Sequence, residues 1–434
     1  MSRHHVLRLG ALMIFLPAQL AMAASQPTQP TDAARSVHPA AALQAIRPAA
    51  AQRRTRRVTA LQPKLILLLA VDQLRADRLT DKLPGGLGRL VREGFVYDNA
   101  TLNHAMTSTC PGHVVMTTGV NPSKAGIAGN SYVDRDAWEE RYCVDDDDPD
   151  AQVLGVADER RSPAAINVTS LGGWLKAASP KSKVLSVAGK DRAAITLGGK
   201  AADGAYWYNR EASLFTTSRH YVRQLPGYLH AFNGKDFFVD GYGGRFPPEW
   251  KHGKGSLRPD DFPGESKVRS NTSGHPLNQG EGRGRAENIY FSPYVDDATL
   301  ALATQMLAAE KLGQRGVTDL LALGFSATDT VGHMYGPFSA ESEATLNQLD
   351  ANLDRFLKLL DARLGQGSYI VALTADHGVQ PLPEWQAVND ELDCPVEGGR
   401  IELTKTALSA YWHTYWKFTA PLNDPTELVK LAPG

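Results

Sequence analysis

The chain has 434 residues, and its 46 Lys and Arg against 47 Asp and Glu leave a formal net charge of −1. This balance excludes the basic excess of a nucleic-acid-binding protein and the acidic excess of a solvating tail. The length suits one large domain with an inserted cap, or two domains, and a hydrophobic fraction of 42% is ample for a buried core.

Residues 1–23 have the pattern of a secretory signal peptide. A charged head, residues 3–8, precedes the apolar stretch Leu9–Leu20, and Ala21–Ala23 forms a small-residue cleavage pattern. The apolar stretch is too short to span a bilayer comfortably, and no other stretch of the sequence approaches a membrane span. We therefore expect a periplasmic or secreted protein without a transmembrane segment.

Changes in composition divide the rest of the chain. Residues 24–62 are rich in Ala, Pro, Gln, Thr and Arg and are interpreted as a flexible linker. Apolar runs alternate with helical patterns in residues 63–198 and 291–434, which predicts one α/β core built from two parts of the chain. Residues 199–290 are dense in Gly, Tyr, Trp, Pro and Asn and are interpreted as an inserted cap region.

Unbroken apolar runs predict strands of a mostly parallel central sheet, sandwiched by helices on both faces. The predicted strands, in chain order, are 65–71, the vicinity of 95–97, 183–188, 320–325 and 369–373. The predicted helices are 86–93, a short helix that opens at Thr109 and closes at Gly119, 168–178, the vicinity of 220–232, 295–311 and 339–364.

The stretch Ser108–His113 brings a hydroxyl group to the start of a helix. Thr109 occupies the position expected of an N-cap residue, and Pro111 suits the first helical turn because its missing N–H costs nothing there. Free backbone N–H groups and the positive end of the helix dipole make such a position a natural seat for phosphate. Without further context, however, a plain helix cap is the commoner role.

Residues of metal-ligand type follow three of the predicted strands: Asp72, then Asp329 with His333, then the adjacent Asp376 and His377. Asp329 and His333 are four residues apart, so their side chains share one side of a helical turn. Each residue alone has an ordinary explanation as a cap or a loop residue. Their recurrence at one edge of the sheet favours a site for zinc, which accepts carboxylate and imidazole ligands.

Six motifs in order closely resemble those of the alkaline phosphatase superfamily, in particular bacterial periplasmic alkaline phosphatases with a threonine nucleophile. The resemblance runs from about Leu65 to Glu384 and implies the α/β fold of that superfamily. The motifs are Val71-Asp72, Thr109-Cys-Pro-Gly-His113, Gly126-Ile127 with Asn130, Lys190-Asp191-Arg192, Asp329-Thr-Val-Gly-His333 and Thr374-Ala-Asp-His-Gly378.

The resemblance implies zinc-dependent hydrolysis of phosphate monoesters through a phosphothreonine intermediate, with two Zn²⁺ ions per chain and Thr109 as the nucleophile. The implied ligands of the first ion are Asp72, Thr109, Asp376 and His377. The implied ligands of the second are Asp329, His333 and a further histidine. Two such ions together would stabilise both the attacking and the leaving oxygen.

The pair Lys190 and Arg192 decides between substrate classes, because a phosphate monoester presents charged oxygens that two cations can bind. Asn130 would donate to the same oxygens. Related diesterases generally lack this pair, so small-molecule phosphate monoesters are the expected substrates. A phosphodiesterase or nucleotide pyrophosphatase on the same scaffold is the alternative, and a sulfatase is disfavoured because the Cys-x-Pro-x-Arg pattern is absent.

Members of the superfamily usually continue beyond the point where this sequence stops and supply the last zinc histidine there. The only histidine after His377 is His413, which lacks the following glycine. We therefore expect a C-terminally truncated chain that binds the second zinc weakly, and a zinc-binding remnant with little turnover is a further alternative. A monomer is expected, and which two of Cys110, Cys143 and Cys394 pair stays open.

Overall fold

The computed structural model describes residues 62–280 and 282–389 and two short segments, 401–402 and 430–431. The predicted signal peptide, nearly all of the predicted linker, Cys394 and His413 lie outside the described residues. No helix in the described part of the chain is long and apolar enough to cross a membrane.

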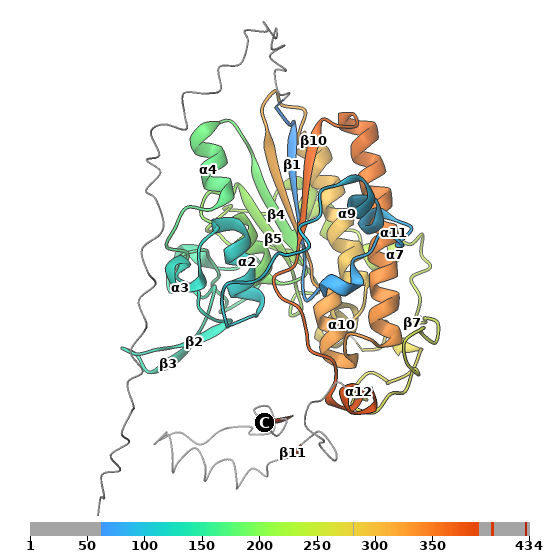
Figure 1. The fold of residues 1–434 in the computed structure, drawn as a ribbon. Coiled ribbons are helices and arrows are strands. Elements are labelled where there is room, and N and C mark those ends of the chain that lie inside the picture. The colour runs from blue at the N-terminus through green and yellow to red at the C-terminus, as the bar shows by residue number, and fades with distance from the viewer. Residues whose placement is uncertain (1–61, 281, 390–400, 403–429, 432–434) are drawn as a thin grey trace, which may run out of the picture. The chain divides into compact units, whose positions relative to one another are not determined.

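A six-stranded sheet in the order β10-β1-β9-β4-β5-β6 forms the centre of the fold (Figure 1). All neighbouring strands are parallel except β6, which runs antiparallel to β5. The predicted class, a mostly parallel α/β fold, is confirmed. The strands are β1 (Leu65–Val71), β4 (Val184–Ala188), β5 (Gly204–Asn209), β6 (Leu214–Thr216), β9 (Asp319–Phe325) and β10 (Tyr369–Thr374).

Helices cover both faces of this sheet (Figure 1). On one face α5 (Asp191–Gly198) contacts the strands, and α2 (Thr109–Thr118), α3 (Pro122–Ala125) and α4 (Leu171–Ala178) pack around it. On the other face α9 (Tyr294–Ala309) contacts the strands. The helices grouped with it are α1 (Gly86–Glu93), α6 (Gly227–Asn233), α8 (Arg283–Tyr290), α10 (Ala327–Tyr335) and α11 (Ala340–Leu364).

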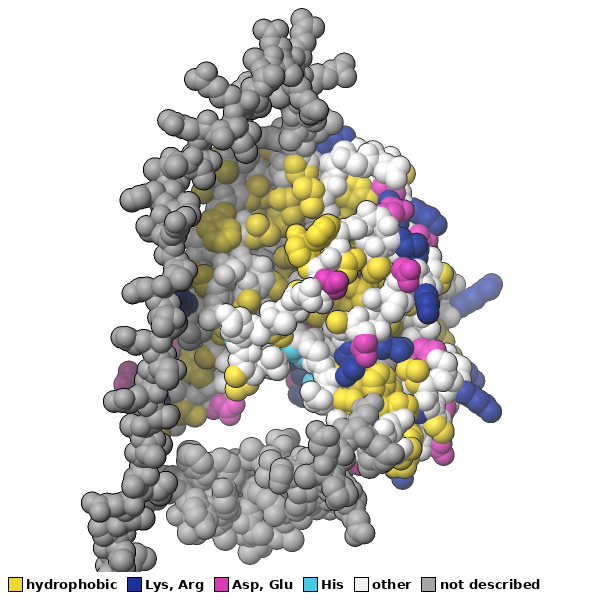
Figure 2. All heavy atoms as spheres, in the orientation of Figure 1, with side chains coloured by type: hydrophobic (Ala, Val, Ile, Leu, Met, Phe, Trp, Pro, Cys, Tyr) yellow, Lys and Arg dark blue, Asp and Glu magenta, His cyan; other side chains and the backbone are white. Residues whose placement is uncertain are grey.

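The alternation of side chains along β1 explains why both faces need a cover. Leu67 and Leu69 join the core that includes Leu353 of α11, whereas Leu68 and Ala70 join the opposite core with Leu197 of α5. Because β1 is apolar on both faces, it is stable only between two helical layers. Among the described strands β10 lies at the edge, and the side chain of its Ile370 is 52% exposed. Figure 2 shows hydrophobic side chains on the upper part of the face in view.

The remaining described elements are short. They are the 3₁₀ turns η1 (Ala76–Arg78) and η2 (Pro149–Ala151), the helices α7 (Phe237–Asp240) and α12 (Pro383–Val388), and the two-stranded pairs β2 (Ser131–Asp134) with β3 (Glu139–Tyr142), β7 (Glu249–Trp250) with β8 (His275–Pro276), and β11 (Ile401–Glu402) with β12 (Lys430–Leu431).

Three expectations from the sequence were wrong. No strand forms at residues 95–97, where Phe95 and Tyr97 are 81% and 77% exposed and no described strand pairs with them. The helix expected from 220 begins only at Gly227, because Pro226 disfavours a helical conformation in the residue before it. Ser108, not Thr109, is the N-cap of α2, so Thr109 is the first helical residue.

The region predicted as an insertion, residues 199–290, opens with two strands that belong to the main sheet, β5 and β6. Both are fully or largely buried, with Trp207 and Tyr208 in the core. The sheet therefore extends further along the chain than the change in composition indicated. The position of the domain boundary itself stays a prediction.

A buried carboxylate on α11 fixes the start of α1. Asp350 accepts hydrogen bonds from the backbone N–H groups of Gly85, Leu87 and Gly88, at 2.6, 2.7 and 3.3 Å. These N–H groups have no partner within their own helix. We expect Asp350→Asn to lower the free energy of unfolding by about 1–3 kcal/mol, because the amide can turn only one acceptor oxygen toward three donors.

Urea denaturation measures this change. Asp354→Asn is the matched control on the same helix, since Asp354 pairs with Lys358, whose side chain is 70% exposed. An exposed pair of this kind contributes less than about 0.5 kcal/mol. Equal effects of the two substitutions would contradict the role of Asp350.

Candidate active site

The carboxyl ends of four neighbouring strands meet at one edge of the sheet. Asp72 follows β1, Lys190 follows β4, Asp329 lies in α10 directly after β9, and Asp376 follows β10. Open α/β sheets bind ligands at this edge. The strand order therefore brings together residues that are up to about 300 positions apart in the sequence.

Lys190 lies between two of these carboxylates. Its Nζ is 2.5 Å from Asp72 Oδ2 and 2.5 Å from Asp329 Oδ2, and all three side chains are at least 96% buried. Burial opposes the charge on Lys190, but the two carboxylates outweigh it and raise the lysine pKa. Burial, together with the negative charges of Asp376 and Asp329, raises the pKa of Asp72 well above its usual range. The site therefore carries more negative charge than Lys190 alone can balance.

Asp376 and His377 complete the group on the side of β10. His377 Nδ1 donates to the carbonyl oxygen of Gly378 at 2.8 Å, so its Nε2 lone pair faces Asp72 Oδ1 and Asp376 Oδ2, each 3.4 Å away. A histidine that ligates a metal commonly donates its other ring N–H to a carbonyl in this way. The orientation of His377 is thus that of a metal ligand.

His113 also belongs to the site, although no role was assigned to it from the sequence. Its Nδ1 donates to the carbonyl oxygen of Thr109 at 2.9 Å and lies 3.2 Å from Asp376 Oδ2, and its side chain is fully buried. Burial opposes the ionisation of Asp376, but His113 and His377 outweigh it and lower the pKa of this carboxyl. The signal was present in the sequence, because His113 follows Thr109 by one helical turn.

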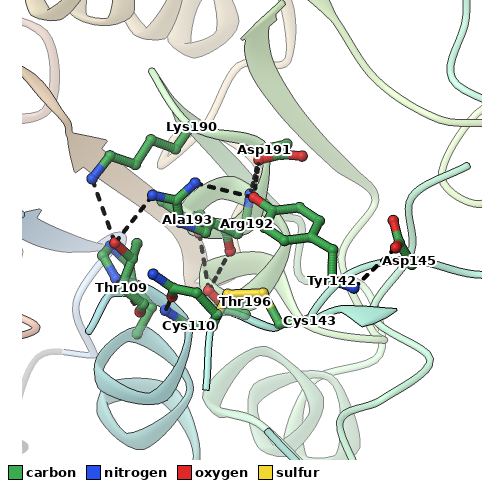
Figure 3. Close-up of a disulfide and its surroundings, with 12 residues drawn as sticks. Thr109, Cys110, Tyr142, Cys143, Asp145, Lys190, Asp191, Arg192, Ala193 and Thr196 are labelled. Atoms are coloured by element: carbon green, nitrogen blue, oxygen red, sulfur yellow. Dashed lines mark hydrogen bonds between the residues drawn. A yellow bond between two sulfur atoms is a disulfide. The ribbon is translucent and has the colours of Figure 1, made fainter. Parts of the chain in front are cut away.

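Thr109 begins α2 with its hydroxyl directed at the two predicted cations (Figure 3). Its Oγ1 lies 3.4 Å from Lys190 Nζ and 3.5 Å from Arg192 Nη2. Arg192 Nη1 donates to the hydroxyl of Tyr142 at 3.1 Å, which in turn donates to Asp191 at 2.7 Å. Burial lowers the pKa of Arg192, but Tyr142, Tyr290 and Asp191 outweigh burial and raise it. The guanidinium therefore keeps its charge.

A disulfide between Cys110 and Cys143 holds the end of β3, with Tyr142, against the start of α2 (Figure 3). The Cα atoms of the two cysteines are 6.6 Å apart. Asn130 Oδ1 accepts a hydrogen bond from the backbone N–H of Cys110 at 2.8 Å. The amide NH₂ of Asn130 is thereby turned away from the Cys110 N–H. The disulfide also assigns the cysteine pairing that the sequence left open, since Cys110 pairs with Cys143.

His333 lies at the outer edge of the site. Its Nε2 is 3.2 Å from Asp329 Oδ1, as the spacing of four residues on a helix predicts, but its side chain is 69% exposed. Burial opposes the ionisation of Asp329, whereas Lys190 and His333 lower its pKa. Among the described residues of the site, His333 therefore contacts Asp329 and no other carboxylate or cation.

Gln73 is a site residue that the sequence did not reveal. Its backbone N–H donates to Asp376 Oδ1 at 3.0 Å, and its Nε2 donates to Asp329 Oδ1 at 2.9 Å. Its φ of 68° is uncommon for a residue other than glycine and is held by these two bonds. Gln73 thus orients two carboxylates from different strands, and only its position next to Asp72 could have suggested it.

The residues present fit a bound divalent cation. Two buried carboxylate oxygens, Asp72 Oδ1 and Asp376 Oδ2, have no hydrogen-bond partner among the described residues. Ligand atoms of Asp72, Asp329 and His377 lie within 4.8 Å of one another. Buried carboxylate oxygens without a donor are costly, and a cation removes that cost. The set of oxygen and imidazole donors suits zinc.

Known proteins resemble this chain over most of its length. Residues 66–421 match the family model described as type I phosphodiesterase / nucleotide pyrophosphatase. The chain is 35% identical to alkaline phosphatase PhoV of Synechococcus elongatus, over 80% of this chain and 63% of that protein. It is also 35% identical to alkaline phosphatase PhoK of Sphingomonas sp., over 77% of this chain and 58% of that protein. It thus spans about three fifths of the length of these relatives.

The fold comparison gives the same family. A crystal structure of alkaline phosphatase PafA superposes with a TM-score of 0.72 at 27% identity, over 82% of this chain and 69% of that one. The likeness in fold and the family match over most of the chain lead to one conclusion: this chain belongs to the type I phosphodiesterase / nucleotide pyrophosphatase family of the alkaline phosphatase superfamily.

Proposed function

We propose that the protein hydrolyses phosphate monoesters through a phosphothreonine intermediate and requires two zinc ions. The observation that carries this proposal is the placement of Thr109 Oγ1 within 3.5 Å of both Lys190 and Arg192, beside a buried group of carboxylates and imidazoles. The names of the relatives PhoV and PhoK, both alkaline phosphatases, support it.

The residues divide into two sets of zinc ligands. One ion would be held by Asp72, Asp376, His377 and the Thr109 oxygen. The other would be held by Asp329, His333 and a further histidine that is not among the described residues. Bound there, zinc would supply positive charge that lowers the pKa of the attacking hydroxyl and stabilises the attacking and leaving oxygens.

The protein side chains bind and orient the phosphoryl group. Arg192, the second residue of α5, and Asn130, just before β2, would bind phosphoryl oxygens beside Thr109. Lys190 pairs with Asp72 and Asp329, and if these carboxylates held metal ions its ammonium group would be available to bind a phosphate oxygen. Thr109 Oγ1 forms a bond to phosphorus as the ester bond breaks and the alcohol leaves. Water then cleaves the phosphothreonine and releases inorganic phosphate.

Hydrolysis of phosphodiesters on the same scaffold is the second candidate, and the family model that matches the chain favours it. The two functions differ in the charge of the substrate, because a diester has one negative oxygen fewer for Lys190 to bind. We expect Lys190→Ala to lower kcat/KM about 10²–10³-fold for an aryl phosphate but less than about tenfold for its methyl aryl diester. Initial rates with both esters measure the difference.

Lys124→Ala is the control for this experiment, since Lys124 is an exposed lysine on the neighbouring helix α3. It should leave both rates unchanged. If the wild-type protein prefers the diester, or if Lys190→Ala reduces both rates equally, the diesterase is the better assignment. Absence of turnover of either ester by the zinc-loaded protein would favour a zinc-binding protein without catalysis.

The cellular setting follows from the same proposal. The N-terminal sequence pattern supports export to the periplasm or the medium, where a phosphatase meets small-molecule phosphate esters. We propose a monomer, since one chain supplies every residue assigned to the phosphoryl group. Sedimentation and N-terminal sequencing of the secreted protein test these two points.

A further inference from the structure

A second cluster of metal-ligand side chains shares no residue with the active site. It joins His252, just after β7, His275 of β8 and Glu341 in the first turn of α11. The Nε2 atoms of the two imidazoles are 3.1 Å apart. Glu341 Oε1 lies 3.2 Å from Nε2 of His275 and 3.7 Å from Nε2 of His252.

The hydrogen bonds of the two histidines fix which ring nitrogen carries a proton. His252 Nδ1 lies 2.7 Å from the carbonyl oxygen of Gly253, and His275 Nδ1 lies 2.9 Å from that of Arg269. A carbonyl oxygen only accepts, so each Nδ1 must donate. Both Nε2 lone pairs of the neutral rings therefore face each other and the carboxylate.

Glu341 makes this arrangement costly without a cation. Its side chain is fully buried, and neither carboxylate oxygen has a hydrogen-bond partner among the described residues. Four acceptor atoms, two nitrogens and two oxygens, thus converge in the protein interior. A single proton would join only one pair of them, whereas a divalent ion engages all four.

We propose that His252, His275 and Glu341 bind a structural zinc ion, separate from any zinc of the active site. The donor set is the His₂Glu combination that zinc accepts, with the second Glu341 oxygen available for the fourth position. In tetrahedral zinc sites with bonds near 2.05 Å, neighbouring ligand atoms are about 3.3 Å apart. The separations of 3.1, 3.2 and 3.7 Å are close to this value.

The surroundings support an ion in this position. Each ligating ring donates its other N–H to a carbonyl oxygen, as metal-bound histidines commonly do. Asp260 Oδ1 is buried, has no hydrogen-bond partner in the part of the chain that the structure describes, and lies 3.8 Å from His252 Nδ1, where it adds negative charge. The nearby Arg258 forms its ion pair with Glu265 at 2.7 Å. Its charge also acts on Glu341, but no hydrogen bond joins these two side chains among the described residues.

The ion would have a structural rather than a catalytic role, because the ligating side chains are at most 4% exposed and offer no route for a substrate. It would fasten the loop between β7 and β8 to the start of α11. His275 Nδ1 also lies 3.1 Å from the hydroxyl of Tyr335, the last residue of α10. The same helix carries Asp329 and His333, so the ion would support the position of two active-site residues.

Anomalous diffraction from crystals of the wild-type protein equilibrated with zinc tests the site directly. Data collected above and below the zinc absorption edge should give a difference peak between His252, His275 and Glu341. Its absence, in crystals of the full chain equilibrated with zinc, would overturn the proposal. This result does not depend on whether the active site is loaded or on whether the protein is a phosphatase.

Metal analysis of variants provides the second test. We expect His275→Gln and Glu341→Gln each to lower the zinc content by one ion per chain relative to the wild type. His230→Gln is the matched control, because His230 is an exposed histidine on α6, and it should retain the wild-type zinc content. Folded His275→Gln and Glu341→Gln proteins with unchanged zinc content would contradict the assignment.

Discussion

Replacing Thr109 with alanine should reduce kcat/KM for an aryl phosphate by at least about 10³-fold, because the substitution removes the group that attacks phosphorus. The hydroxyl of Thr109 lies near both cations, with Lys190 Nζ at 3.4 Å and Arg192 Nη2 at 3.5 Å. Thr109→Ser, which keeps the hydroxyl, should retain a substantial part of the activity. Initial rates of the three proteins, each loaded with zinc, measure the effect.

Ser108→Ala is the sharpest control for this prediction. Ser108 precedes Thr109 in the chain. It is the N-cap residue of α2, but its buried hydroxyl forms no hydrogen bond to the helix or to any other described residue. Its removal should change the rate less than about threefold. Acid quenching with a labelled substrate should trap phosphate on wild-type protein and on Ser108→Ala but not on Thr109→Ala. Loss of the trapped phosphate in Ser108→Ala instead would move the nucleophile by one residue.

The second large effect concerns stability and depends on the metal. In protein freed of zinc by a chelator, Lys190 is the cation that lies between Asp72 and Asp329. Lys190→Ala leaves these buried carboxylates without it, so we expect the free energy of unfolding to fall by about 3–5 kcal/mol. In zinc-loaded protein the ions replace the lysine charge, and the loss should be below about 1 kcal/mol. Denaturant titrations with and without zinc give both values.

Lys176→Ala is the matched control for the lysine substitution. Lys176 forms an ion pair with Asp203 at 2.7 Å, but both side chains are partly exposed, at 26% and 36%. Such a pair contributes at most about 1 kcal/mol, and the contribution should not depend on zinc. If Lys190→Ala lowered the free energy of unfolding equally with and without zinc, zinc would not replace the lysine charge at Asp72 and Asp329.

Individual residues show how far sequence reasoning reached in the active site. Asp72, Asp329, Asp376 and His377 were predicted because each follows an unbroken apolar run, and the structure gathers all four. Gln73 and His113 were missed as functional residues. A glutamine after a strand has no pattern of its own, whereas His113 had a signal in its spacing of one helical turn from Thr109. Gln73 donates hydrogen bonds to Asp376 and Asp329, and His113 lies 3.2 Å from Asp376.

The His252–His275–Glu341 cluster was missed for a different reason. Its residues lie in a glycine-rich region and at the start of a long amphipathic helix, and their spacings of 23 and 66 residues match no short metal motif. The cluster exists only because the loop between β7 and β8 folds back onto α11. No local property of the sequence encodes that contact.

The sequence by itself determined four of the six strands of the main sheet, β1, β4, β9 and β10, several of the helices that cover it, and the class of fold. It also determined the residue types that follow these strands. These features are local, since hydrophobic periodicity and side-chain chemistry depend on neighbours within a few residues. Only the tertiary structure decided that Lys190 lies between two carboxylates and that Cys110 pairs with Cys143. It alone also brought His252 and His275 to Glu341. Such contacts depend on the order of strands in the sheet and on the path of loops, because both are set by packing between distant segments of the chain.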